Sequence, residues 1–161
     1  MFLSKETFST VIEHAPLVSI DLVILNEKGQ ALLGERLNRP AQHYWFVPGG
    51  RILKNEPLSV AFERLTLVEL GEVFSLSDAT LLGSYDHFYP DNVFGETYST
   101  HYVAIAYVLK LSKPLNQLPM KVQHSSYKWF DIADLLQSDI VHKHSKWYFE
   151  ALMGQHKGAE K

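Results

Sequence analysis

Residues 47–71 read VPGGRILKNEPLSVAFERLTLVELG, and this stretch decides the fold. Two glycines follow a proline, an acid stands at Glu56, and a run of helix-forming residues continues to Gly71. Pro57 suits the first turn of a helix, where its missing N–H would have no partner anyway, and glycine suits the left-handed residue that closes a helix. The stretch therefore predicts a loop, a helix and a stop at Gly71.

The predicted helix has an apolar stripe that contains a carboxylate. At about 100° per residue, Leu58, Phe62 and Leu65 fall within roughly 60° of one another and form a face toward a core. Glu69 lies on the same stripe. A buried carboxylate is costly unless a cation or hydrogen-bond donors meet it. Either the stripe reaches solvent or an arginine at the helix end, or Glu69 serves a functional site.

The order of residues in this stretch resembles a known signature. Gly50 is followed after five residues by Glu56, after seven more by Arg64, and then by Glu69 and Gly71. This order resembles the Nudix box of hydrolases that act on nucleoside diphosphates linked to another group. The resemblance implies an α/β fold, the Nudix fold, with a mixed curved β-sheet sandwiched between α-helices.

The box departs from the family pattern at positions that carry chemistry. The pattern has acids where this chain has Leu65 and Val68, and an apolar residue where it has Glu72. Ordinary Nudix enzymes hold two or three divalent ions with several helix carboxylates, and Glu69 alone cannot neutralise several dications. This degenerate box resembles that of the GDP-mannose mannosyl hydrolases, a divergent branch of the superfamily.

Composition fits one globular domain. Of 161 residues, 46% are hydrophobic, so we expect a single Nudix domain over residues 1–161, with 154–161 as a frayed tail. A net charge of −3 without a Lys/Arg block argues against binding to nucleic acid. With no cysteine and no long apolar segment, the sequence favours a cytoplasmic protein that does not bind membranes.

The N-terminal segment is expected to form a helix from Ser4 to His14. Phe2, Leu3 and Phe8 are residues that usually pack in a core or against a helix. In the resembled branch, however, this segment helps to hold the nucleotide. The resemblance therefore makes these three side chains candidates for substrate contact.

The next segment predicts a hairpin with polar residues at informative places. Residues 17–25 read LVSIDLVIL and predict a buried strand, and residues 30–33 complete the hairpin. Asp21 interrupts the first strand and either pairs with an arginine or binds sugar hydroxyls. Arg36 and Arg39 follow the second strand and suit bidentate contacts to a diphosphate.

The approach to the box, Trp45-x-x-Pro48-Gly49-Gly50, also resembles Nudix proteins, in which a tight glycine turn aims a backbone carbonyl at the metal. By this resemblance Gly49 supplies a carbonyl ligand. We expect Arg51, which follows directly, to stabilise the departing diphosphate.

Two further strands are predicted at residues 79–88 and 98–110. His87 precedes two aromatic residues, as a histidine does in the resembled branch, and this likeness places it near the hexose. Tyr102 is either a core tyrosine or a phenol that donates to a phosphate oxygen.

The last predicted strand follows Gln123 and His124. Loops before this strand supply late catalytic groups in the superfamily. His124 is the candidate general base, since the ordinary pKa of histidine lets it accept a proton at neutral pH. Gln123 is the third candidate metal ligand after Gly49 and Glu69. Neighbours on a strand point to opposite sides, so both residues serve one site only if this stretch is a loop.

Two closing helices are expected at residues 131–138 and 142–153. His142 and His144 are two residues apart and diverge on a helix, so we interpret them as surface residues rather than as a metal pair.

Together these features imply a Mg²⁺-dependent hydrolase that converts GDP-mannose or GDP-glucose to GDP and free hexose. Water attacks the anomeric carbon with inversion, His124 acts as the base, and Arg36 and Arg51 stabilise the leaving GDP. The resemblance implies one Mg²⁺ per subunit, replaceable by Mn²⁺, and a homodimer. Two alternatives stay open. One is a conventional pyrophosphohydrolase that releases GMP and sugar phosphate and regroups Glu56, Glu63 and Glu69 around metals, and the other is a non-catalytic nucleotide-binding module.

Overall fold

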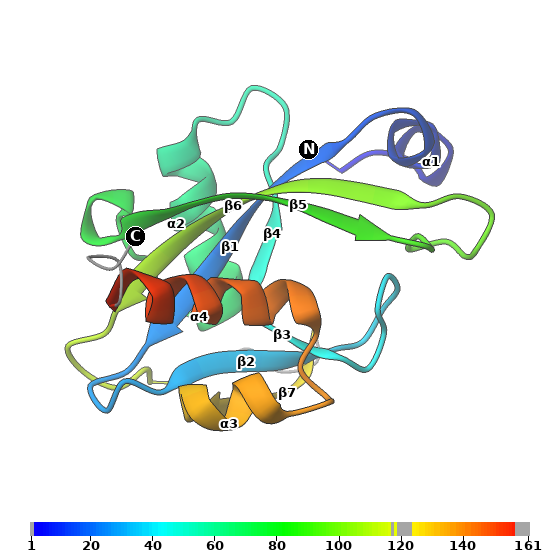
Figure 1. Ribbon diagram of the computed structural model, residues 1–161. Helices are drawn as coiled ribbons and strands as arrows, with labels where there is room; N and C mark the ends of the chain where they lie inside the picture. Colours follow the sequence, from blue (N-terminus) through cyan, green and yellow to red (C-terminus); the bar gives the residue numbers. More distant parts are fainter. Residues whose placement is uncertain (1, 117, 119–123, 157–161) are drawn as a thin grey trace.

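A mixed β-sheet forms the centre of the molecule (Figure 1). The computed structural model describes residues 2–116, 118 and 124–156. In this part of the chain the strands are β1 (Leu17–Leu25), β2 (Ala31–Arg36), β3 (Trp45–Phe46), β4 (Gly49–Arg51), β5 (Thr80–Tyr89), β6 (Thr100–Lys110) and β7 (His124–Phe130). Their order is β3-β2-β1-β6-β5, and in addition β4 pairs with β1 and β7 pairs with β2. Strands β1 and β6 run parallel, and the other pairs are antiparallel.

Helices cover both faces of this sheet. They are α1 (Lys5–His14), α2 (Leu58–Leu70), the short 3-10 helix η1 (Leu76–Asp78), α3 (Ile132–Gln137) and α4 (Lys143–His156). Helix α2 lies behind the sheet in Figure 1, whereas α3 and α4 lie in front of it. The predicted α/β architecture, a mixed sheet between helices, is confirmed.

The alternation of side chains along β1 explains this layering. Ile20, Leu22 and Ile24 pack in one apolar cluster with residues of α2. Val23 points the other way and packs with residues of α3 and α4. Because both faces of a central strand are buried, its sequence is nearly continuously apolar. Asp21, two residues before Val23, lies on the α4 face by the same alternation.

Helix α2 forms as its sequence predicts, with one correction. It begins after Pro57 and ends at Gly71, whose φ of 79° is the left-handed conformation expected of a closing glycine. The predicted stripe is buried at Phe62, Leu65 and Glu69. Leu58, however, is 40% exposed. It occupies the first turn, and side chains point back toward the N-terminus of a helix, so Leu58 projects past the packed region.

The ends of the chain differ little from expectation. Ser4 caps α1 by accepting a hydrogen bond from the backbone N–H of Thr7 at 3.2 Å. Helix α4 continues to His156, beyond the predicted end at Met153, and residues 157–161 lie outside the described part.

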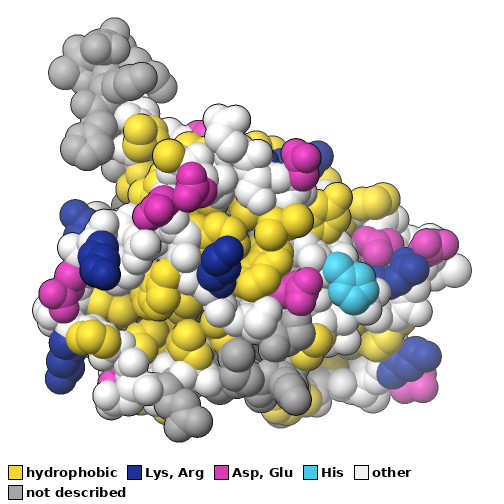
Figure 2. All heavy atoms as spheres, turned by 90° about the horizontal axis from the view of Figure 1, so that it is seen from below, with side chains coloured by type: hydrophobic (Ala, Val, Ile, Leu, Met, Phe, Trp, Pro, Cys, Tyr) yellow, Lys and Arg dark blue, Asp and Glu magenta, His cyan; other side chains and the backbone are white. Residues whose placement is uncertain are grey.

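The surface of the described chain gives two further observations. None of its helices has the length and apolar character needed to cross a bilayer. On the face shown in Figure 2, hydrophobic side chains gather near the centre, and Lys and Arg side chains are interspersed with Asp and Glu.

Candidate active site

A cavity of about 280 Å³ opens between α1 and the ends of the sheet strands. Residues that the sequence marked as functional line it from six different elements. They are Phe8, Asp21, Arg36, Gly49, Arg51, His87 and Tyr102. The tertiary structure thus brings together in one cavity most of the predicted site.

The remaining predicted residues lie elsewhere. Phe2 and Leu3 precede α1 and are 96% and 36% exposed, outside the cavity lining. Gln123 lies outside the described residues. His124 is the first residue of strand β7, so the expectation that the strand begins after it is wrong. It is paired in register with Arg36, and its side chain lies outside the described part. The strand places the backbone of His124 next to a cavity residue.

The glycine turn at the cavity is required by close packing. A Cβ atom on Gly49 would lie 2.4 Å from the carbonyl oxygen of Ile20 and 2.6 Å from Asp21 Oδ1, and one on Gly50 would lie 2.6 Å from Leu65 Cδ2. A larger residue at position 49 would therefore push β4 away from β1, whereas one at position 50 would require the end of the Leu65 side chain to shift. Glycine at position 49 allows close approach of the two backbones.

The register of β4 also sets the direction of the Gly49 carbonyl. Backbone hydrogen bonds join Leu22 N to Pro48 O and Ile52 N to Val18 O, both at 2.8 Å. Paired residues in an antiparallel ladder alternate between bonded and non-bonded pairs, so the pair of Asp21 and Gly49 is non-bonded and the Gly49 carbonyl points away from β1.

The carbonyl of Arg51, two residues after Gly49 on β4, shows which element lies on the side of the strand that faces away from β1. The Arg51 carbonyl accepts a hydrogen bond from the Arg64 side chain of α2 at 2.9 Å. Carbonyls two residues apart on a strand point the same way. The Gly49 carbonyl therefore faces α2, the helix that carries Glu69.

Two box residues brace the loop between β4 and α2. Arg64 donates to both carboxylate oxygens of Glu56, at 2.7 and 2.9 Å, and Glu56 also accepts from the backbone N–H of Leu53 at 3.0 Å. The Arg64 hydrogen bonds hold the pKa of Glu56 below its ordinary value. These contacts fix the loop that delivers Arg51 to the cavity.

Glu69 is the buried carboxylate behind the glycine turn. Its side chain is 1% exposed and accepts a hydrogen bond from the Tyr127 hydroxyl at 3.4 Å. Burial raises the pKa of Glu69 to about 7, with Tyr127 and Arg36 opposing the rise and Asp21 adding to it. A carboxylate in this situation gains from a nearby cation.

The residues around Glu69 suit one metal ion rather than a cluster. Mg²⁺ takes oxygen ligands, and Glu69 with the Gly49 carbonyl offers two on neighbouring elements. Within the described residues, no group of three or more His, Asp or Glu side chains is placed to hold a metal. A divalent ion bound beside Glu69 would therefore have few protein ligands among the described residues.

Two arginines present positive charge to the cavity. The guanidinium of Arg36 lies over the ring of Phe46 and that of Arg51 over the ring of Phe8, each 4.9 Å from the ring centroid. A guanidinium stacked on a ring keeps its N–H edge available. The pair suits the bidentate recognition of phosphate oxygens.

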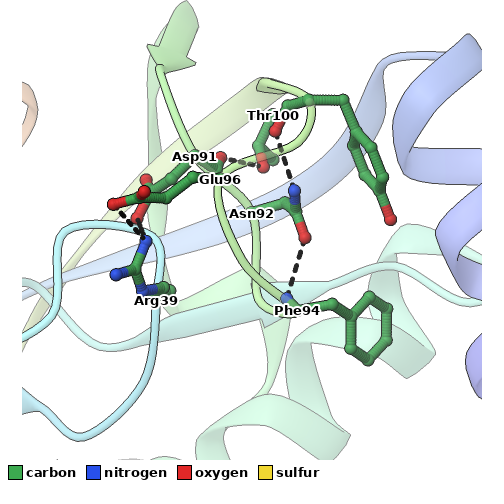
Figure 3. A network of polar contacts seen from close by, with 7 residues as sticks. Arg39, Asp91, Asn92, Phe94, Glu96 and Thr100 are labelled. Carbon is green, nitrogen blue, oxygen red and sulfur yellow. Dashed lines mark hydrogen bonds and ion pairs between the residues drawn. The ribbon is translucent and has the colours of Figure 1, made fainter.

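Arg39 was the other arginine expected to contact a diphosphate. At the cavity mouth it forms ion pairs with two acidic side chains. Its Nη1 atom lies 3.3 Å from Asp91 Oδ2 and 3.2 Å from Glu96 Oε1. Both ion pairs are drawn in Figure 3. The loop that carries these acids is folded on itself by Asn92, which donates to the Tyr98 carbonyl and accepts from Phe94 N, both at 2.8 Å. Arg39 therefore ties the loop after β2 to the loop between β5 and β6.

Asp21 is a cavity residue whose pKa reflects two opposing influences, burial and the charge of Arg36. It lines the cavity, and the charge of Arg36 lowers its pKa, as expected of an acid near an arginine. Burial outweighs this influence and raises the pKa of Asp21 to about 6. Its Oδ2 atom accepts a hydrogen bond from Tyr148 at 2.5 Å.

The expectation that His142 and His144 lie on the surface is wrong. His144 is 1% exposed and its ring stacks on His87 with centroids 4.3 Å apart, and His142 stacks on Phe46 at 4.6 Å. The start of α4 packs against β5, so both rings point inward. Burial lowers the pKa of His87 and of His142 to about 4 and that of His144 to about 3.

Tyr148 is the residue that sequence reasoning missed. It is fully buried and contacts both Asp21 and His87. The sequence predicted the helix that carries Tyr148, but nothing in it indicated which strands this residue would meet.

The fold and the cavity define a class of protein, and comparison with known families identifies it. Residues 15–151 match the model of the NUDIX domain, so the chain belongs to the Nudix family. Members of this family are hydrolases of nucleotide-linked substrates and typically use a divalent metal such as Mg²⁺ or Mn²⁺.

Particular relatives agree with this assignment. The chain is 40% identical over 126 residues, 78% of each chain, to the low-salt glycan biosynthesis protein Agl8 of Haloferax volcanii. A MutT NUDIX hydrolase from Burkholderia pseudomallei superposes with a TM-score of 0.68 at 26% identity, covering 86% of this chain and 98% of that one. A MutT protein from Methanosarcina mazei has a TM-score of 0.71 at 20% identity, over 89% and 98%, and shares the fold.

Proposed function

We propose that this chain hydrolyses a GDP-linked hexose, GDP-mannose or GDP-glucose, to GDP and free hexose. Water attacks the anomeric carbon rather than phosphorus and inverts its configuration. The observation that carries the proposal is the pairing of one buried helix carboxylate, Glu69, with a cavity lined by Arg36 and Arg51.

The alternative, attack at phosphorus with several metals, lacks ligands in the described chain. It would regroup Glu56, Glu63 and Glu69 around the ions. Glu56 accepts hydrogen bonds from Nε and Nη2 of Arg64, and Glu63 is exposed on the outer side of α2. Of these three carboxylates, Glu69 alone remains for metal binding, which favours neutralisation of the leaving group as the chemistry.

In the proposed reaction, Glu69, the Gly49 carbonyl and Gln123 hold one Mg²⁺ per subunit, with Mn²⁺ as a substitute. When bound, this ion supplies positive charge to the diphosphate oxygens. Arg36 and Arg51 add donors to the same oxygens. GDP with its charge neutralised is a good leaving group, so the usual second carboxylate of a glycosidase is not needed to protonate it.

The remaining residues receive roles in binding and base catalysis. His124 is proposed to take the proton of the attacking water, and Asp21, His87 and Tyr102 to contact the hexose and the phosphate. Phe8 faces the cavity beside Arg51, in keeping with a nucleotide contact.

Phe2 and Leu3, exposed at the end of α1, are proposed to close on the nucleotide in a homodimer. Light scattering during size-exclusion chromatography tests the dimer, and elution as a monomer at all concentrations would contradict it.

The Haloferax relative supports a sugar substrate. It is named for glycan biosynthesis, a process that uses activated sugars, and it matches this chain over most of its length.

The deciding experiment uses GDP-mannose, Mg²⁺ and water labelled with heavy oxygen. Label in the sugar hydroxyl, with GDP as the nucleotide product, supports the proposal. Label in phosphate, with GMP as product, establishes the pyrophosphohydrolase instead. Binding of GDP-mannose without turnover identifies a non-catalytic module.

The base assignment has its own test. We expect His124→Gln to lower kcat by at least about 100-fold, because general bases contribute 10² to 10⁴ in rate, with little change in affinity for GDP-mannose. His14→Gln is the control, since His14 has a side chain 69% exposed on α1. A kcat within a few-fold of wild type would remove His124 as the base.

A further inference from the structure

Tyr148 links two cavity residues that are far apart in the sequence. Its hydroxyl donates to Asp21 Oδ2 at 2.5 Å and lies 3.2 Å from His87 Nε2. The three residues come from α4, β1 and β5. Asp21 and His87 line the cavity, while the fully buried Tyr148 stands behind them.

The chemistry of these groups fixes the direction of both hydrogen bonds. A phenol has one proton to donate, and an ionised carboxylate can only accept. With its proton given to Asp21, the Tyr148 oxygen acts as the acceptor toward His87, so His87 Nε2 carries the proton that it donates. A neutral histidine has one ring proton, which leaves the His87 Nδ1 atom with a lone pair. Among the described residues, Nδ1 of His87 makes no hydrogen bond.

Ring packing holds this arrangement in place. His144 stacks on His87 with an interplanar angle of 8°, and Tyr85 packs edge-on against Tyr148 with centroids 4.9 Å apart. His144 is 1% exposed and His87 is 3% exposed. In an interior packed this closely, neither ring can turn over without displacing its neighbour.

We infer that Tyr148 is a positioning residue that fixes the Asp21 carboxylate in one orientation and His87 in the tautomer whose Nδ1 accepts a hydroxyl proton. The identity of the hydroxyl donor, the hexose of a GDP-sugar, rests on the proposed function. Asp21 on β1 and His87 on β5, which β6 separates in the sheet, offer two acceptors to one cavity, and two such acceptors suit the hydroxyl groups of a sugar ring. The nucleotide is bound by other residues, so Tyr148 distinguishes the sugar nucleotide from GDP alone.

The test compares Tyr148→Phe with Tyr85→Phe. The first variant removes only the hydroxyl between Asp21 and His87, and the second removes a hydroxyl from the ring packed against it. Nitrogen NMR of the full chain, with His87 signals assigned from a His87→Gln sample, reports the tautomer. We expect the Nε2–H form in wild type and in Tyr85→Phe, and a mixture of tautomers in Tyr148→Phe.

Kinetics and binding give the second readout. We expect kcat/KM for GDP-mannose to fall by about 10- to 100-fold in Tyr148→Phe, the range for losing a hydrogen bond to a charged group. Affinity for GDP, which lacks the sugar, should stay within about two-fold of wild type by the same argument.

Distinct outcomes separate this inference from the proposed function. An Nδ1–H tautomer in wild type, or an unchanged tautomer in Tyr148→Phe, overturns the inference even if the chain hydrolyses GDP-mannose. Equal weakening of GDP and GDP-mannose binding indicates a general structural role and also overturns it. If the wild-type protein hydrolyses no GDP-hexose, the proposed function fails. The tautomer of His87 then still shows whether Tyr148 positions that residue.

Discussion

Glu69 shows how the environment of one residue sets the stability of the molecule. Its pKa is raised from an ordinary value of 4.5 to about 7 by burial. Between these pH values the folded state keeps a proton that the unfolded state releases, so this residue makes the free energy of unfolding fall as the pH rises through that window. At pH 8 the folded state contains a buried charge, which a bound cation would stabilise beyond the contribution of Tyr127 and Arg36.

Glu69→Gln should therefore stabilise the metal-free protein at pH 8, by up to about 3 kcal/mol from the size of the pKa shift. The gain should vanish well below pH 4.5, where Glu69 is protonated in both states. Thermal unfolding with a chelator measures it, and adding Mg²⁺ should raise the Tm of wild type but not of Glu69→Gln.

Glu63→Gln is the control for this variant, because Glu63 lies exposed on the same helix. An equal response of wild type and Glu69→Gln to Mg²⁺ would exclude Glu69 as a metal ligand.

At the scale of secondary structure, the contact between Arg64 and Glu56 joins α2 to the loop that leads into it. Arg64→Lys keeps the charge but cannot donate to both Glu56 oxygens and to the Arg51 carbonyl at once. We expect a loss of about 2 kcal/mol in the free energy of unfolding, the range for hydrogen bonds to charged groups. Urea unfolding measures this change.

The same variant should weaken GDP binding, because the Arg51 backbone loses its support from α2. Lys54→Ala, in the exposed part of the loop, should leave both properties near wild type. If Arg64→Lys unfolds within about 0.5 kcal/mol of wild type, the usual spread for a surface change, the brace is unimportant.

At the scale of the whole molecule, packing of α4 against β5 assembles the histidines His87, His142 and His144. Their pKa values are lowered, so on acidification the unfolded state takes up protons that the folded state does not. Each histidine therefore makes the protein less stable as the pH falls from about 6.5 toward 4. Asp21 and Glu69 act in the opposite sense, because their pKa values are raised.

A comparison of wild type with His144→Phe isolates the contribution of His144 to the pH dependence of stability, since Asp21 and Glu69 are present in both proteins. His144→Phe keeps a ring in the stack, and the slope of unfolding free energy against pH should decrease by about 1.4 kcal/mol per pH unit between pH 6 and 4.5. Urea unfolding at several pH values provides the slope. His14→Gln should leave it unchanged, and an unchanged slope in His144→Phe would mean that His144 is protonated in the folded state.

Much of the fold and part of the site could be predicted from the sequence. The glycine at 71, the apolar period of α2 and the alternation in β1 each follow from constraints within a few residues. The Nudix resemblance then pointed to residues such as Arg36 and Tyr102, and the structure places them around one cavity. Leu58 and His144 were misjudged because periodicity shows which residues share a face, not how far the neighbouring element extends.

The sequence by itself determined the box helix with Glu69 on its apolar stripe and, through the Nudix resemblance, the layered α/β fold, because periodicity and motif spacing are local. Only the tertiary structure decided that Tyr148 meets Asp21, 127 positions earlier, and His87, 61 positions earlier. Contacts of this range depend on the register of β1, β5 and α4 taken together. No short stretch of the chain encodes that register, so the hydrogen bonds behind the cavity wall appear only once the elements are packed.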